Sequence, residues 1–160
     1  MKKIATRLWS MMLLGALLFS FMTPANAASK GYSFKYKGAS ISVGGSATKF
    51  LDKAGKPTKT SETKNCAGKP GKDVSYTYKY LKLTTYKYGS SETVQKITLT
   101  SKKVKTAEGI KVGSKERDVK KKYKGAKKNS WGDYEITKGT SKLSILMNDG
   151  KVESIEYTAK

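Results

Sequence analysis

The feature that most constrains this chain is an internal repetition. The segment Ile41-Ser42-Val43-Gly44 recurs as Ile110-Lys111-Val112-Gly113, at an offset of 69. A second match follows in the same order, because residues 94–99 (VQKITL) align with residues 152–157 (VESIEY) at an offset of 58. The first copy therefore holds 11 more residues than the second, the difference between the two offsets. Two matches in the same order predict a duplicated unit.

A short helix is predicted after the first match in each copy. In the first copy, four apolar residues stand at positions i, i+3, i+4 and i+7, which form one stripe of a helix: Ala47, Phe50, Leu51 and Ala54. In the second copy, Ser114 is a suitable N-cap residue. Val119 and Tyr123 form the inner stripe there, and Gly125 follows the end. Both helices are thus expected to present one apolar face.

The rest of each copy is predicted to be β-structure. In the first copy, apolar residues alternate with polar ones until Leu81 breaks the parity through a bulge or a turn: Val74, Tyr76, Tyr78 and Tyr80. In the second copy, Leu143, Ile145 and Met147 alternate in the same way, and Asn148-Asp149-Gly150 predicts a hairpin turn. Residues 60–72, rich in Lys, Gly, Pro and Thr, are expected to be a loop insertion.

These patterns predict an α+β protein made of two tandem repeats. Each repeat holds a short helix followed by about three antiparallel strands. Residues 28–101 form repeat 1, and residues 102–160 form repeat 2.

The first 27 residues are predicted to be a secretory signal peptide. Lys2, Lys3 and Arg7 precede an apolar stretch without charges, and Ala25-Asn26-Ala27 has the small-x-small pattern of a cleavage site. The alternative is a retained membrane helix, but the apolar stretch is shorter than the roughly 20 residues that a span requires. We therefore expect a secreted or extracytoplasmic protein with no transmembrane segment after cleavage.

The residues that are missing narrow the chemistry. The chain has no His and a single Cys, Cys66, so it can build neither an imidazole-based catalytic pair nor a multi-thiolate zinc site. Cys66 is expected to be buried as a small apolar residue, with an intermolecular disulfide as the alternative. Glu153 and Glu156 do not converge, because their spacing puts them on opposite faces of a strand. We predict no catalytic, cofactor-binding or metal-binding residues.

The repeat resembles a known family. The unit I-x-V-G followed by an amphipathic helix, a Tyr-containing strand, a hairpin and V-x-x-I-x-Y is similar to the BLIP-like/BamE-like superfamily, which includes the SmpA/OmlA lipoproteins. Residues 106–114, with Val119 and Tyr123, carry the similarity best, and it extends over roughly residues 38–160. The resemblance implies helices on one face of a curved antiparallel sheet, with the other face open to bind protein. Paired cysteines and a lipidated N-terminal Cys, found in members of that family, are absent from this chain.

The charge of the chain is carried almost wholly by lysine. Without the first 27 residues, 30 basic and 12 acidic residues leave a net charge of +18, and Arg117 is the one remaining arginine. Specific nucleic-acid readout favours arginine, so we expect no specific nucleic-acid partner. Lysines suit non-specific attraction to polyanions, with solubility as the alternative role. The densest group is predicted to bind polyanions: Lys120, Lys121, Lys122, Lys124, Lys127 and Lys128.

A set of aromatic residues is the other candidate site. On an open sheet face these side chains would form a rigid amphipathic surface for a partner. The alternative is that the rings cover the core under the helices. The residues predicted to bind a partner are Tyr76, Tyr78, Tyr80, Trp131 and Tyr134.

The predicted function is therefore that of a secreted, non-enzymatic binding module that engages a protein partner through an open sheet face. The alternative is electrostatic adhesion to anionic cell-envelope polymers or lipids through lysine patches. An enzyme is a distant third hypothesis, and no cofactor is expected.

Overall fold

The structure is a computed structural model that describes residues 31–160. The predicted signal peptide, residues 1–27, lies outside this range. The first half of the described chain holds one helix and six strands: β1 (Ser33–Tyr36), β2 (Ala39–Ser42), α1 (Thr48–Ala54), β3 (Lys59–Lys64), β4 (Lys72–Thr77), β5 (Leu81–Tyr88) and β6 (Ser91–Leu99). The second half holds one helix and four strands: α2 (Glu116–Lys122), β7 (Lys127–Lys128), β8 (Tyr134–Lys138), β9 (Ser141–Asn148) and β10 (Lys151–Ala159). The α+β class is confirmed.

Eight of the strands form one antiparallel sheet in the order β3-β4-β5-β6-β10-β9-β8-β7. Strands β6 and β10, the last of each half, pair at the centre, where Thr98 lies opposite Glu156. Strands β1 and β2 form a separate hairpin. Each half of the sheet therefore contributes four strands, one more than the sequence predicts.

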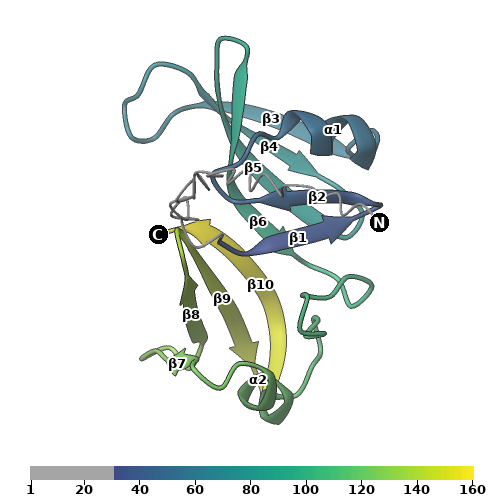
Figure 1. Cartoon of the computed structure of the whole chain (residues 1–160), viewed down its shortest axis with the longest axis vertical. Coiled ribbons are helices and arrows are strands. Elements are labelled where there is room, and N and C mark those ends of the chain that lie inside the picture. Colours follow the sequence, from purple (N-terminus) through teal and green to yellow (C-terminus); the bar gives the residue numbers. More distant parts are fainter. Residues whose placement is uncertain (1–30) are drawn as a thin grey trace, which may run out of the picture.

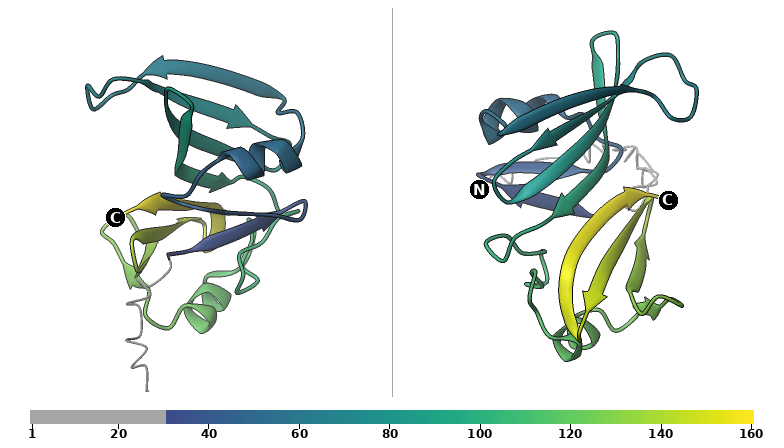
Figure 2. Two further views of the ribbon diagram at one scale, coloured as in Figure 1. Left: turned by 45° about the horizontal axis from the view of Figure 1, so that its top comes forward. Right: turned by 180° about the vertical axis from the view of Figure 1, so that it is seen from behind.

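The hairpin, α1 and α2 bury their apolar residues against the sheet in one continuous core. Figure 1 shows α1 and the hairpin in front of β4–β6, with α2 at the far end of β9 and β10. From behind, the strands face the viewer and the hairpin lies beyond them (Figure 2). Alternation along the strands leaves the second face of the sheet polar.

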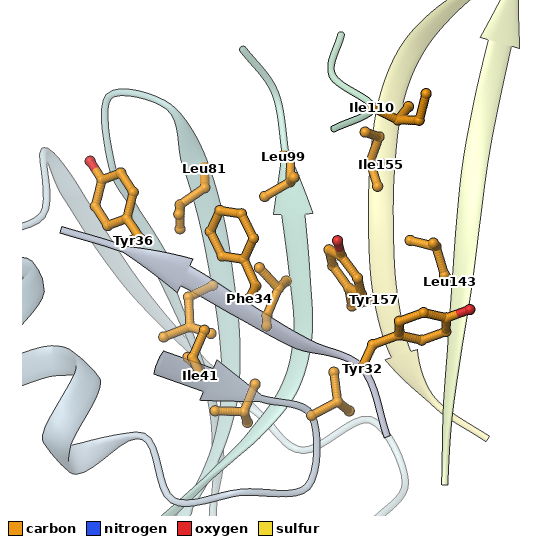
Figure 3. Packing of buried hydrophobic residues seen from close by; sticks show 14 of the residues in the cluster. Tyr32, Phe34, Tyr36, Ile41, Leu81, Leu99, Ile110, Leu143, Ile155 and Tyr157 are labelled. Carbon is orange, nitrogen blue, oxygen red and sulfur yellow. The ribbon is translucent and has the colours of Figure 1, made fainter. Parts of the chain in front are cut away.

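Strand β1 ties the two halves of the sheet together. Tyr32 and Phe34 pack against Tyr157 of β10, with ring centroids 5.8 Å and 6.2 Å apart, respectively (Figure 3). The same strand places Tyr36 against Phe50 of α1 and against Tyr78, at 6.2 Å and 6.1 Å. The alternation of aromatic and polar residues over 32–37 is a strand pattern, but the sequence prediction did not assign this hairpin.

Helix α1 matches its prediction, since Phe50 and Ala54 are buried and the helix ends before Gly55, which has φ of 79°. Helix α2 begins differently from the prediction. Lys115 is its N-cap residue, without a side-chain cap, while Ser114 Oγ accepts a hydrogen bond from the backbone N–H of Lys111 at 3.1 Å. The prediction of Ser114 as the N-cap is therefore wrong.

Three further expectations are corrected or confirmed by the strands. Residues 60–72 are not one loop, because most of β3 lies within them and pairs with β4 along its whole length. Every residue of β3 is exposed and polar, so this edge strand carries no apolar alternation. Cys66, in the loop that follows, is exposed rather than buried. The hairpin turn at Asp149-Gly150 is confirmed, with both residues at positive φ.

Candidate functional site

Three of the tyrosines predicted to bind a partner, Tyr76, Tyr78 and Tyr80, lie on the covered side of the sheet. Tyr78 is 5% exposed and packs edge-on against Phe50 at 6.0 Å. Tyr76 and Tyr80 are partly buried against the same core. The physical reason is strand parity, because Tyr76 and Tyr78 share their side of the chain with Val74, which is fully buried. These rings do not form an exposed platform.

The tyrosine hydroxyls are engaged internally. Tyr76 donates to Glu92 Oε1 at 2.8 Å, and burial together with this hydrogen bond raises the pKa of Tyr76 above its ordinary value. Tyr134, only 4% exposed, donates to Glu116 Oε1 at 2.6 Å. Of the five aromatic residues predicted to bind a partner, Trp131 alone is strongly exposed, at 85%.

The side chain of Trp131 is exposed to solvent from a turn that is fixed by hydrogen bonds. The side-chain oxygen of Asn129 accepts hydrogen bonds from the backbone N–H groups of Trp131 and Asp133, at 3.0 Å and 2.9 Å. Gly132, at φ of 88°, donates its N–H to the carbonyl of Asn129. Asp133 in turn accepts from the N–H of Met147 at 2.8 Å. The indole is therefore exposed on a fixed backbone, apart from the four tyrosines.

Two of the six lysines predicted to bind polyanions form ion pairs with one carboxylate, that of Glu116, and the other four do not. The Nζ atoms of Lys120 and Lys128 form ion pairs with Glu116 Oε1, at 3.2 Å and 3.0 Å. The hydrogen bond from Tyr134 and then those from Lys128 and Lys120 lower the pKa of Glu116 to about 2. We call the six predicted lysines together the α2 cluster. Its four members without an ion pair, all exposed, are Lys121, Lys122, Lys124 and Lys127.

The uncovered face of the sheet is polar and carries paired charges. One cross-strand row runs over all eight strands: Lys59, Thr77, Lys82, Thr98, Glu156, Ser144, Glu135 and Lys127. Its acids are matched by neighbouring lysines, with Lys96 3.3 Å from Glu156 and Lys142 3.4 Å from Glu135. This face offers mainly hydroxyls and charged groups, with more lysines than acids, and Tyr86 of β5 also lies on it, opposite Asp73 and Thr93.

A second lysine-rich region is a cleft between β1 and the segment that links the two halves. The lysines of the linking segment stand together in the sequence, but only the fold joins them to those of the hairpin. Its volume is about 570 Å³. Its walls carry four lysines and no acidic residue: Lys35 and Lys37 from the hairpin, and Lys103 and Lys105 from the linking segment. Phe34, Tyr36, Tyr80 and Val104 supply its apolar surface. Hereafter "the cleft" means this site.

The acidic and basic residues of the described chain are used differently. Nine of its twelve carboxylates accept a hydrogen bond or an ion pair from within the protein: Glu62, Asp73, Glu92, Glu108, Glu116, Asp118, Asp133, Glu135 and Glu156. Only five of its 28 lysines take part in ion pairs: Lys72, Lys96, Lys120, Lys128 and Lys142. The positive charge is consequently left facing solvent.

Residues 31–160 contain no cluster of three or more acidic or cysteine side chains that could hold a metal ion. Over the same residues, no helix has both the length and the apolar character to cross a membrane.

Comparison with known proteins gives little. No family model matches the chain, and no curated protein matches it. Among solved structures, the chain is similar to an extracellular protein containing a SCP domain from Bacillus anthracis, with a TM-score of 0.47 and 14% sequence identity. The match covers 74% of this chain and 44% of that one, so this chain spans less than half of its length. The predicted resemblance to the BLIP-like/BamE-like superfamily is accordingly wrong.

Proposed function

We propose that this protein is an exported, non-enzymatic module that binds anionic polymers of the cell envelope through its lysines. One observation carries the proposal. The carboxylates are mostly consumed by internal hydrogen bonds and ion pairs, whereas 23 of the 28 lysines in residues 31–160 make no ion pair. A surface of this kind attracts polyanions and releases their counterions on binding.

This choice differs from a protein-binding sheet face because of the placement of the tyrosines. Four of the five aromatic residues that would have formed the platform are buried or partly buried. Interfaces between proteins gain most of their energy from exposed aromatic and arginine anchors. The described chain exposes Trp131, Tyr88 and many lysines instead, which favours an electrostatic partner. Export is proposed from the sequence of residues 1–27.

We also propose that the scaffold arose by duplication, with repeats at 28–101 and 102–160. Corresponding hydrogen bonds support this. Gly44 donates its N–H to the carbonyl of Val94 at 2.8 Å, and Gly113 donates to Val152 at 2.7 Å. The two donors stand at the offset of the first sequence match, and the two acceptors stand at the offset of the second. The extra residue of the β5–β6 pair, Gln95, likewise has its counterpart in Glu153.

The central strand pair supports the same proposal. An offset of 58 converts Thr98 into Glu156, and these two residues lie opposite each other where β6 meets β10. Two corresponding residues that face each other must lie on the twofold axis that would relate the two copies. The proposal predicts that the two four-strand halves superimpose on each other about this pair.

The experiment for the proposed function measures retention of the purified protein on a polyanion. Beads carrying a phosphate polymer are compared with neutral dextran beads at increasing salt. If about four lysines displace counterions, the affinity falls about 50-fold between 50 mM and 200 mM salt. Equal retention on dextran would contradict the proposal. Capture of a protein from envelope extract that persists at high salt would favour the protein-binding alternative instead.

A further inference from the structure

The cleft differs from the other lysine-rich surfaces by being concave and free of acids among its lining residues. Lys35, Lys103 and Lys105 are exposed at its rim and make no ion pair in the described chain. The nearest acid along the linking segment, Glu108, accepts a hydrogen bond from Tyr123. The four lysine ammonium groups around the cleft repel one another. A bound anion would reduce this repulsion and would also be attracted to each of them.

The walls of the cleft are already in position. Lys37 Nζ donates to the carbonyl of Ala54 at the end of α1, at 3.0 Å, and lies 5.5 Å from the ring centre of Tyr36. On the opposite wall, Thr106 is buried. Its Oγ1 accepts a hydrogen bond from the N–H of Ile110 and lies 2.9 Å from the hydroxyl oxygen of Tyr123. Pre-organised walls lower the ordering cost of binding.

The side chains of the cleft indicate the chemistry of its ligand. The cleft contains no arginine, whose planar fork pairs with carboxylates and phosphates alike, so each of its positive charges is a single lysine ammonium group. Lysine is a point charge that suits phosphate. Between the lysines lie Tyr80, Tyr36 and Val104, which offer apolar surface to carbon atoms. A ligand that satisfies both features alternates single negative charges with short carbon units.

We propose that the cleft binds a phosphodiester-linked polyol segment, with the phosphates on Lys35, Lys103 and Lys105 and the carbon units against Tyr80 and Val104. The inference rests on the proposed function and adds the place and the chemical class of the ligand. The phosphodiester can belong to a soluble or wall-bound chain or to a glycerophospholipid headgroup. The two sources share one chemistry and are distinguished below.

The test compares two double variants that remove the same charge. Lys35→Gln with Lys105→Gln removes two of the four lysines of the cleft, and Lys124→Gln with Lys127→Gln removes two of the six lysines of the α2 cluster. Lys37 is kept, because its amine braces α1. Binding of a synthetic glycerol phosphate oligomer is measured by calorimetry. Because the cleft variant loses two charge-assisted contacts with the phosphates, its affinity should fall at least tenfold, and that of the control less than about threefold.

Tyr80→Ala supplies an uncharged arm, expected to weaken the oligomer about threefold or more through lost contact with its carbon units. Vesicles of phosphatidylglycerol provide the lipid source. Cleft-dependent binding to the oligomer alone assigns the polymer, and cleft-dependent binding to the vesicles alone assigns the headgroup. Polyglutamate binding as tightly as the oligomer would overturn the phosphodiester assignment.

The two levels of the proposal fail separately. If the unaltered protein binds neither the phosphate polymer nor polyglutamate in a salt-dependent way, the proposed function fails. If it binds but the two double variants lose affinity equally, with both folded by circular dichroism, only the cleft inference fails.

Discussion

The cleft and the α2 cluster are both rich in lysine, but they differ in their acidic neighbours. The α2 cluster has six lysines close together in the sequence, and Glu116 lies between two of them in space. The cleft has four lysines from two distant segments and no acid among its lining residues. Four lysines of each region make no ion pair, so the denser run in the sequence leaves no larger number of unpaired lysines than the cleft does. Local lysine count does not measure the charge that remains for a partner.

The two regions also rest on different cores. Beneath the hairpin, Tyr36, Phe50 and Tyr78 form an aromatic cluster with ring centroids 6.0–6.2 Å apart. Beneath α2, Val119 and Tyr123 are the buried residues of the helix and its end. The core beneath the hairpin therefore contains a cluster of three rings, whereas α2 and its end bury one ring, that of Tyr123.

Among the variants that test these two regions, Phe50→Ala should have the largest effect on the free energy of unfolding. The side chain is 1% exposed at the centre of the aromatic cluster, and removing it leaves a cavity that costs about 3–5 kcal/mol in the free energy of unfolding. Urea unfolding measures the loss. Lys49→Ala, on the exposed side of the same helix, is the control and should change stability by less than about 0.5 kcal/mol. Equal effects of the two variants would show that the cluster does not anchor the hairpin.

Val119→Ala tests the packing of α2 against the core. Val119 is fully buried, and losing its two methyl groups should cost about 2 kcal/mol, less than Phe50→Ala. Glycerol phosphate binding should stay close to that of the unaltered protein, because Val119 is not among the residues that line the cleft. Lys121→Ala is the control on the exposed side. A Val119→Ala protein that loses oligomer binding while remaining folded would contradict the separation of the two regions.

Glu116→Gln removes the carboxylate that distinguishes the α2 cluster. The folded-state pKa of Glu116 is about 2, below its ordinary value of 4.5. The contribution of its charge to stability is therefore present above about pH 4.5 and is lost as the pH falls toward 2. The stability difference between the unaltered and variant proteins should shrink between pH 5 and pH 2 by urea unfolding. A difference independent of pH would show that the ion pairs contribute nothing.

The same variant bears on binding. At neutral pH, Glu116→Gln frees Lys120 and Lys128 from their shared partner and raises the net charge by one. Retention on phosphate beads should rise by a small factor, about twofold, and the effect should vanish at high salt.

Sequence patterns predicted the local parts of this fold. Helix α1 followed from the spacing of Phe50 and Ala54, and the β9–β10 hairpin followed from Asp149-Gly150, because both depend on neighbouring residues alone. Strand β3 could not be predicted in this way. It is a polar edge strand whose only ordering influence is its pairing with β4.

The candidate site was less predictable than the fold. The four lysines of the cleft belong to two segments that lie far apart in the sequence, and only the packing of β1 across the sheet joins them. The sequence pattern places Tyr76, Tyr78 and Tyr80 in one strand, but β4 ends at Thr77, so Tyr78 and Tyr80 lie in the turn before β5. Which side the helices cover is decided by Val74, Leu83 and other strand residues together, so the alternation of Tyr76 and Tyr78 alone left both answers open.

Trp131 allows the smallest effect to be measured. It is the only tryptophan in residues 31–160 and projects from the turn that follows β7, the strand of Lys127 and Lys128. In a Trp9→Phe background, its quenching by acrylamide reports contact near the α2 cluster. If the oligomer binds in the cleft, quenching should match that of the free protein, because the indole stays 85% exposed. Protection from quenching that disappears in the Lys124→Gln, Lys127→Gln protein would move the ligand to the α2 cluster and reverse the order of the two regions.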